Sequence, residues 1–166
     1  MGLAHARGNL RRMDKRLHIE LVTETYPPDV NGVALTVQSL EHGLRGLGHA
    51  VGVVRPEREG DGTRPDPMLM LVEGAPIPRY PGLRFGLPAG RRLQARWQAQ
   101  RPDAVYIATE GPLGWSALRA CRQLGIPVAT GFHTRFDDYV GRYGAGFLSP
   151  WVFAWLRRFH NRADAT

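Results

Sequence analysis

The sequence contains one cysteine, Cys121, and one lysine, Lys15, and it has no long apolar run. A single cysteine excludes a disulfide framework and a cysteine-based zinc site. The chain lacks the roughly 18 consecutive apolar residues that a membrane-spanning helix needs, and its first residues lack the apolar segment of a signal peptide. A chain of 166 residues can bury enough surface to form a core without a disulfide or a metal. The sequence therefore predicts a cytoplasmic protein.

The net charge of +7 is distributed unevenly along the chain. Residues 1–16 contain five basic residues and one acid, a net charge of +4, which leaves +3 for residues 17–166. We interpret residues 1–16 as a disordered basic tail or an extended translation start, with Met1 and Met13 as the alternative first residues. The other arginines form no stripe with interleaved aromatics on a recognised module, so the sequence predicts no specific nucleic-acid partner.

The sequence also lacks the common phosphate- and metal-binding motifs. A Walker A loop needs a lysine after its glycines, and Lys15 precedes the first predicted strand. Neither a His-Glu-x-x-His motif nor an Asp-x-Asp pair occurs, so the sequence predicts no metal site. The segment GLGHAVG at 46–52 imitates a dinucleotide motif, but it lies between a predicted helix and a predicted strand, which is typical of a helix C-terminus.

Predicted strands and helices alternate from Leu17 onward. Short apolar runs predict strands over 17–23, 50–55, 68–73, 103–109 and 127–132. Apolar residues at helical spacing predict helices over 33–44, 88–100 and 112–124. Because several of the strands are apolar without strict alternation, they indicate a parallel sheet that is covered on both faces. We therefore predict one α/β domain over 17–166 with a doubly wound, Rossmann-like parallel sheet.

Two long loops interrupt this alternation. Residues 56–67 form a polar, turn-rich loop, and residues 74–90 contain four prolines and four glycines. Long loops in a compact domain are commonly functional. The aromatics and the stiffness of proline favour an ordered binding loop at 74–90, and the alternative is a surface loop in which Tyr80 and Phe85 cover the end of the sheet.

The loops from strand to helix are the candidate binding sites, because ligands of open α/β sheets bind at the carboxyl ends of the strands. In the first such loop, 23–33, Asn31 and Gly32 come directly before a predicted helix. Without a side chain, Gly32 would let a pyrophosphate approach the positive end of the helix dipole. The alternative is a turn glycine with positive φ.

Two further loops follow strands. In 109–115, Glu110 either accepts hydrogen bonds from a polyol or caps the next helix, and its position favours the cap. In 131–139, His133 comes directly after a strand, where it can hydrogen-bond a hydroxyl or a phosphate. The alternative for His133 is a loop histidine without a ligand. No role is predicted for the other histidines, which are His5, His18, His42, His49 and His160.

Residues 147–160 carry a broad apolar stripe at helical spacing, which predicts a helix. The pattern favours a helix that packs on the core. The alternative is a peripheral helix at the inner membrane face, with Trp151, Trp155 and Phe159 as contacts and nearby arginines as support.

A family resemblance is carried, in chain order, by LVTETYPPDVNGVALTVQSLEHGLRGLGHAVGVVRP, PRYPGLRFGLPAG, RPDAVYIATEGPLGWSALRACRQLGIPVATGFHTRF, RYGAGFL and RFHNRAD. Together these stretches make residues 17–166 similar to the N-terminal domain of glycosyltransferase family 4. The members of this family are retaining enzymes of the GT-B architecture. The resemblance implies two Rossmann-like domains that face a cleft, with the acceptor on the N-terminal domain and the donor on the C-terminal one. The subgroup that this sequence resembles transfers mannose or a related hexose to lipid or glycan hydroxyls.

The resemblance also implies roles for individual residues. Gly32 approaches the donor diphosphate, and His133, as the catalytic residue, contacts the transferred sugar. The acceptor is bound by Tyr26, Asn31, Tyr80 and Glu110. Arg135 stands where the family often has asparagine, and it either meets an anionic acceptor or disturbs the site. The resemblance implies no metal or cofactor, which agrees with the missing Asp-x-Asp pair. It also implies that the leaving phosphate of a nucleotide sugar such as GDP-mannose or UDP-glucose helps deprotonate the acceptor hydroxyl, so that no protein nucleophile is required.

The chain ends at Thr166, before the expected final strand of this domain and before a donor domain. We therefore expect no transferase activity from the chain alone, and activity when a C-terminal donor domain or a partner chain supplies the missing contacts. The alternative function is a noncatalytic module that binds a glycan or a lipid headgroup. The sequence leaves the donor nucleotide and the acceptor open.

Overall fold

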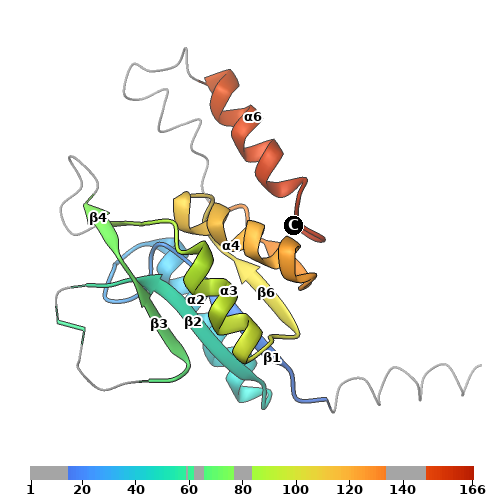
Figure 1. The fold of residues 1–166 in the computed structure, drawn as a ribbon. Helices are drawn as coiled ribbons and strands as arrows, with labels where there is room; N and C mark the ends of the chain where they lie inside the picture. The colour runs from blue at the N-terminus through green and yellow to red at the C-terminus, as the bar shows by residue number, and fades with distance from the viewer. Residues whose placement is uncertain (1–14, 59, 62–65, 77–83, 134–148) are drawn as a thin grey trace, which may run out of the picture.

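A computed structural model describes residues 15–58, 60–61, 66–76, 84–133 and 149–166 (Figure 1). Its main sheet has five strands in the order β3-β2-β1-β6-β7, and every neighbouring pair is parallel. The strands are β1 (His18–Val22), β2 (Ala50–Pro56), β3 (Leu69–Val72), β6 (Ala104–Ile107) and β7 (Val128–Thr130). The predicted doubly wound α/β fold is confirmed, although β6 and β7 are shorter than the apolar runs that contain them.

Helices cover both faces of this sheet. They are α2 (Gly32–Gly46), α3 (Gly90–Ala99), α4 (Pro112–Leu124) and α6 (Ser149–His160). In Figure 1, α3 and α4 lie in front of the sheet and α2 lies behind it. Because successive strand residues point to opposite faces, Leu21 packs with Val37 of α2, whereas Val22 belongs to the larger cluster that contains Trp97 of α3 and Leu118 of α4.

Local signals explain where the helices begin and end. The Asn31 side chain accepts a hydrogen bond from Ala34 N at 2.9 Å and so caps α2. Gly48 and Gly125 have φ of +86° and +61° just after α2 and α4, a conformation that glycine adopts without steric cost. The interpretation of GLGHAVG as a helix C-terminus is therefore confirmed.

A buried ion pair that the sequence analysis missed joins the sheet to α3. Glu20 of β1 is fully buried, and the Arg96 guanidinium donates to its carboxylate from Nε at 3.1 Å and from Nη2 at 2.9 Å. His18 Nε2 lies 3.2 Å from the same carboxylate. Gly52 is aligned with Glu20 on the neighbouring strand, where a Cβ atom would lie 2.3 Å from Glu20 Oε1. The carboxylate therefore takes the space that a larger residue at 52 would need.

The segment 74–90 contains a two-stranded antiparallel hairpin formed by β4 (Gly74–Pro76) and β5 (Arg84–Gly86). The predicted loop is therefore ordered at both ends. Tyr80 lies outside the described residues, so its predicted binding role remains a prediction.

Helix α6 packs on the core, which confirms the favoured interpretation of this segment. Phe159 is fully buried, and its ring centroid lies 5.3 Å from that of Trp115 in α4. The expectation that Phe159 forms a surface contact is wrong, because it faces the core, whereas Trp151 and Trp155 are 76% and 50% exposed. None of the helices in the described residues is both long and apolar enough to span a bilayer.

Candidate functional site

The candidate site lies where the chain changes direction across the sheet. From β1 the chain proceeds to β2 on one side, and from β6 it proceeds to β7 on the other side. Such a switch point opens a crevice at the carboxyl ends of the strands. The two flanking loops are hydrogen-bonded to each other, since Glu24 N donates to Thr109 Oγ1 at 3.0 Å. The loop after β7 begins at the same edge, and His133 lies in its described part.

Glu24, which the sequence analysis missed, occupies the centre of this junction. Its Oε1 accepts a hydrogen bond from Leu113 N at 3.0 Å, in the first turn of α4. Burial raises the pKa of the Glu24 carboxyl from 4.5 to about 7, and the nearby charge of Glu110 adds to the rise, while backbone N–H groups oppose it. A Cβ atom at Gly111, the N-cap residue, would lie 2.1 Å from Glu24 Oε1. Glu24 therefore supplies a hydrogen-bond acceptor to a backbone N–H group in the first turn of α4, where the N-cap residue Gly111 has no side chain to do so.

Glu110 does not cap α4, so that prediction is wrong. Its side chain is nearly buried and faces α6, where His160 Nε2 lies 3.2 Å from Oε1. His160 Nδ1 lies 2.9 Å from Thr130 Oγ1, at the end of β7. Burial raises the pKa of Glu110, and the hydrogen bond with His160 opposes this rise. His160, for which no role was predicted, thus holds the residue that was expected to bind the acceptor.

His133 follows β7, and its partner is a tyrosine on the neighbouring strand. His133 Nε2 lies 2.6 Å from Tyr106 Oη, and the two rings meet edge to face. Burial raises the pKa of the Tyr106 hydroxyl, and the charge of Glu110 adds to this effect. A Cβ atom at Gly131 would lie 2.1 Å from Tyr106 Oη, so glycine at 131 leaves room for the pair. His133 itself is exposed at the edge of the sheet.

Gly32 is the first residue of α2 and lies on the surface. It is not among the glycines with positive φ, so the alternative of a strained turn glycine is wrong. A Cβ atom at Gly32 would meet nothing within 4 Å among the protein's own atoms. The chain itself therefore does not require glycine here, and the space beside the helix N-terminus is open to a ligand.

The side chains of Asn31 and Tyr26 are already engaged within the chain. Besides capping α2, Asn31 donates from Nδ2 to Thr25 Oγ1 at 2.6 Å. The Tyr26 hydroxyl donates to the Glu41 carboxylate, and burial raises the pKa of this hydroxyl. Both residues shape the loop after β1, and their predicted contacts with an acceptor remain predictions. Arg135 lies outside the described residues.

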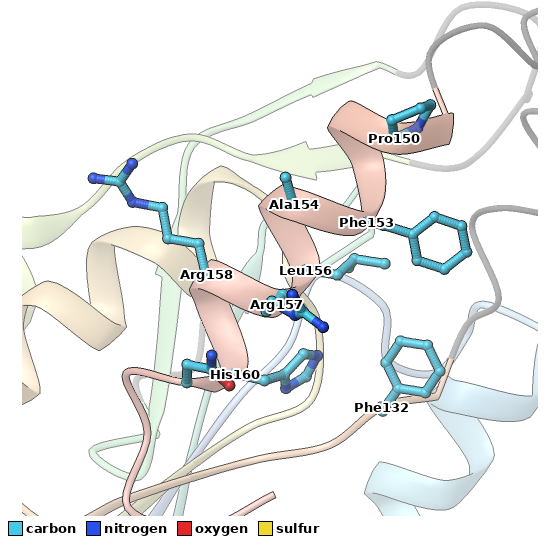
Figure 2. A pocket seen from close by; sticks show the side chains of 9 residues that line it. Phe132, Pro150, Phe153, Ala154, Leu156, Arg157, Arg158 and His160 are labelled. Carbon is cyan, nitrogen blue, oxygen red and sulfur yellow. The ribbon is translucent and has the colours of Figure 1, made fainter.

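A cavity of about 730 Å³ with a mixed apolar and polar lining adjoins this edge of the sheet, between Phe132, in the loop after β7, and helix α6 (Figure 2). Figure 2 shows Phe132 and Phe153 on the same side of the helix, with Leu156 and His160 beside them. Arg158 extends away from the two phenylalanines. The cavity is thus lined both by apolar side chains and by His160, the partner of Glu110.

Sequence comparison assigns this architecture to a family. The family model of Glycosyltransferase Family 4 matches residues 30–166. The chain belongs to glycosyltransferase family 4. The family 4 domain includes the loops after β6 and β7 and the whole of α2, and the GT-B architecture of this family agrees with the Rossmann-like fold.

Curated relatives of this family 4 domain are hexosyltransferases. A GDP-mannose-dependent alpha-mannosyltransferase of Mycolicibacterium smegmatis is 32% identical over 159 residues, which cover 90% of this chain and 41% of the relative. The protein of the same description from Mycobacterium tuberculosis is 31% identical over the same shares of both chains. An alpha-monoglucosyldiacylglycerol synthase of Acholeplasma laidlawii is 32% identical over 125 residues, or 74% of this chain and 31% of the relative. The chain thus spans about two fifths of the length of the mannosyltransferases that it matches.

Proposed function

We propose that this domain is the acceptor-side half of a retaining glycosyltransferase that moves a mannose- or glucose-type hexose from a nucleotide sugar to a lipid or glycan hydroxyl. The observation that carries the proposal is the junction of the loops after β1 and β6 at the switch point, beside the open N-terminus of α2. The names of the relatives support the substrate class, since they include GDP-mannose and a glucosylated diacylglycerol.

The loops suggest a division of roles. Without a side chain, Gly32 leaves open space beside the first residue of α2, which suits a diphosphate at this helix N-terminus. His133 is exposed at the end of β7 and its Nε2 contacts Tyr106 Oη, and we assign to it the hydrogen bond with the transferred sugar. Stabilisation of the leaving diphosphate is a large term in such a reaction. In the proposed enzyme, that stabilisation requires residues of a donor domain, supplied by the same chain or by a partner.

A turnover assay tests this proposal. The full chain is assayed with GDP-mannose and UDP-glucose and a diacylglycerol-based acceptor, alone and after fusion to the C-terminal part of the mycobacterial mannosyltransferase. We expect turnover only from the fusion, and we expect His133→Ala to lower kcat by at least about tenfold. His42→Ala, at an exposed histidine on α2, is the matched control. Activity of the isolated chain would contradict the division between two halves. Acceptor binding with no turnover from any fusion would favour the noncatalytic module.

We also propose that the exposed part of α6 contacts a membrane surface. Trp151 is 76% exposed and Phe153 is 51% exposed, and arginines follow in the last turn of the helix. Aromatic and basic side chains together favour the interface of an anionic bilayer. In a vesicle sedimentation assay with phosphatidylglycerol, Trp151→Ser should reduce binding. Leu47→Ser, at a 75% exposed leucine beyond α2, should not. Equal losses for the two variants would refute this surface.

A further inference from the structure

A second cavity, of about 420 Å³, opens at the same edge of the sheet, beside the ends of β2 and β3. Its lining residues are Glu57, Arg58, Asp61, Leu71 and Arg84. They come from three places in the chain, namely the segment after β2, strand β3 and the hairpin strand β5. The cavity adjoins the candidate site, because Arg58 Nη2 donates to the backbone oxygen of Glu24 at 3.0 Å.

The arginines of this cavity carry buried donors that the described protein leaves unused. The Arg58 side chain is 7% exposed and pairs with Asp29 through Nη2 alone. Its Nε and Nη1 are buried and have no hydrogen-bond partner among the described residues. Arg84 donates from Nη2 to the Gly74 carbonyl, and its Nε is likewise buried without a partner in this part of the chain. Buried cationic donors without acceptors are costly. Because both arginines line the cavity, each would gain by turning these donors toward an acceptor group bound there.

The acidic residues of the cavity do not accept hydrogen bonds from the unpartnered donors of Arg58 and Arg84. Asp61 Oδ2 accepts a hydrogen bond from Arg55 Nη1 at 2.9 Å and another from the Arg58 backbone N at 2.7 Å. Asp61 Oδ1 accepts a hydrogen bond from Arg55 Nη2. The hydrogen bonds from Arg55 lower the pKa of Asp61, so this carboxylate stays ionised and occupied. Glu57 is exposed at the rim.

We propose that this cavity is an oxyanion subsite, which binds a carboxylate or phosphate group of the acceptor. Planar guanidinium donors match such groups in geometry and in charge. The inference rests on the proposed function, because the connection from Arg58 to Glu24 places the subsite beside the loops assigned to the acceptor. Glu57 would repel the anion from the rim and so weaken binding.

Calorimetric titration of the full chain with glucuronate, glucose 6-phosphate and glucose tests the subsite. We expect at least one of the two anions to bind at least tenfold more tightly than glucose. Tighter glucuronate would identify a sugar carboxylate, and tighter glucose 6-phosphate would identify a phosphate. Arg84→Gln and Arg58→Lys should each weaken anion binding about tenfold, whereas Glu57→Gln should strengthen it severalfold. Arg119→Gln, at an exposed arginine on α4, is the control.

Three results would overturn the subsite: equal binding of glucose and both anions, equal losses for Arg84→Gln and Arg119→Gln, or no gain from Glu57→Gln. Thermal unfolding of each variant separates loss of binding from loss of fold. Arg84→Gln is the decisive variant, because Arg58 also holds Asp29. Since anion binding is measured on the chain itself, its failure would leave hexose transfer by the fusion protein untouched. Conversely, an inactive fusion would leave the titration interpretable.

Discussion

Replacing Glu24 by glutamine should remove a large part of the pH dependence of folding stability. Glu24 is 8% exposed, and burial raises its pKa from 4.5 to about 7. Between these two values the unfolded chain has lost the proton that the folded chain retains. The unfolded state then binds fewer protons, so the free energy of unfolding falls as pH rises through this range. Glutamine keeps the shape of the side chain and cannot ionise.

The size of the effect follows from the shift. A rise in the pKa of Glu24 from 4.5 to about 7 corresponds to roughly 3 kcal/mol of unfolding free energy. This contribution is present at low pH and is lost completely once the pH exceeds the folded-state pKa. Between pH 5 and pH 8 the expected loss is about 2 to 3 kcal/mol, because part of it has already occurred at pH 5. At any one pH, glutamine also loses part of the hydrogen bonding to the first turn of α4, and this cost does not vary with pH.

Urea unfolding followed by tryptophan fluorescence at pH 5, 6, 7 and 8 measures this difference. The quantity of interest is the unfolding free energy of Glu24→Gln minus that of the natural chain. We expect it to rise by about 2 to 3 kcal/mol across the series, whatever its starting value. A difference that stays constant with pH would refute the raised pKa of Glu24, even if the variant is less stable throughout.

Three further substitutions test the site geometry by urea unfolding. Gly114→Ala should destabilise the fold by about 1 to 3 kcal/mol, because its Cβ atom would lie 2.0 Å from a backbone oxygen. Gly32→Ala should change stability by less than about 0.5 kcal/mol and yet reduce turnover of the fusion enzyme; unchanged turnover would contradict a diphosphate at Gly32. His160→Ala should cost about 1 to 3 kcal/mol, because it leaves Glu110 buried without its histidine, and a cost equal to that of His42→Ala would exclude this role.

The sequence by itself determined the elements and the family. The alternation of apolar runs with helical spacing predicted the strands and helices, because burial on one or both faces imposes those periods. Asn31 and Gly48 marked the limits of α2. A side-chain cap and a glycine with positive φ act on the helix turn next to them, so both signals are local in the sequence. The position of His133 at the end of a strand was also predictable, because a parallel sheet brings all such ends to one edge.

Only the tertiary structure decided which side chains meet at that edge. Glu24 contacts an amide 89 residues later, and Glu110 meets a histidine 50 residues later. The partner of His133 is Tyr106, 27 residues earlier on the adjacent strand. No local pattern encodes these contacts, because they arise from the order of the strands and from the packing of α4 and α6 on the sheet. The same packing buries Glu24 and Glu110, and their raised pKa values follow from that burial.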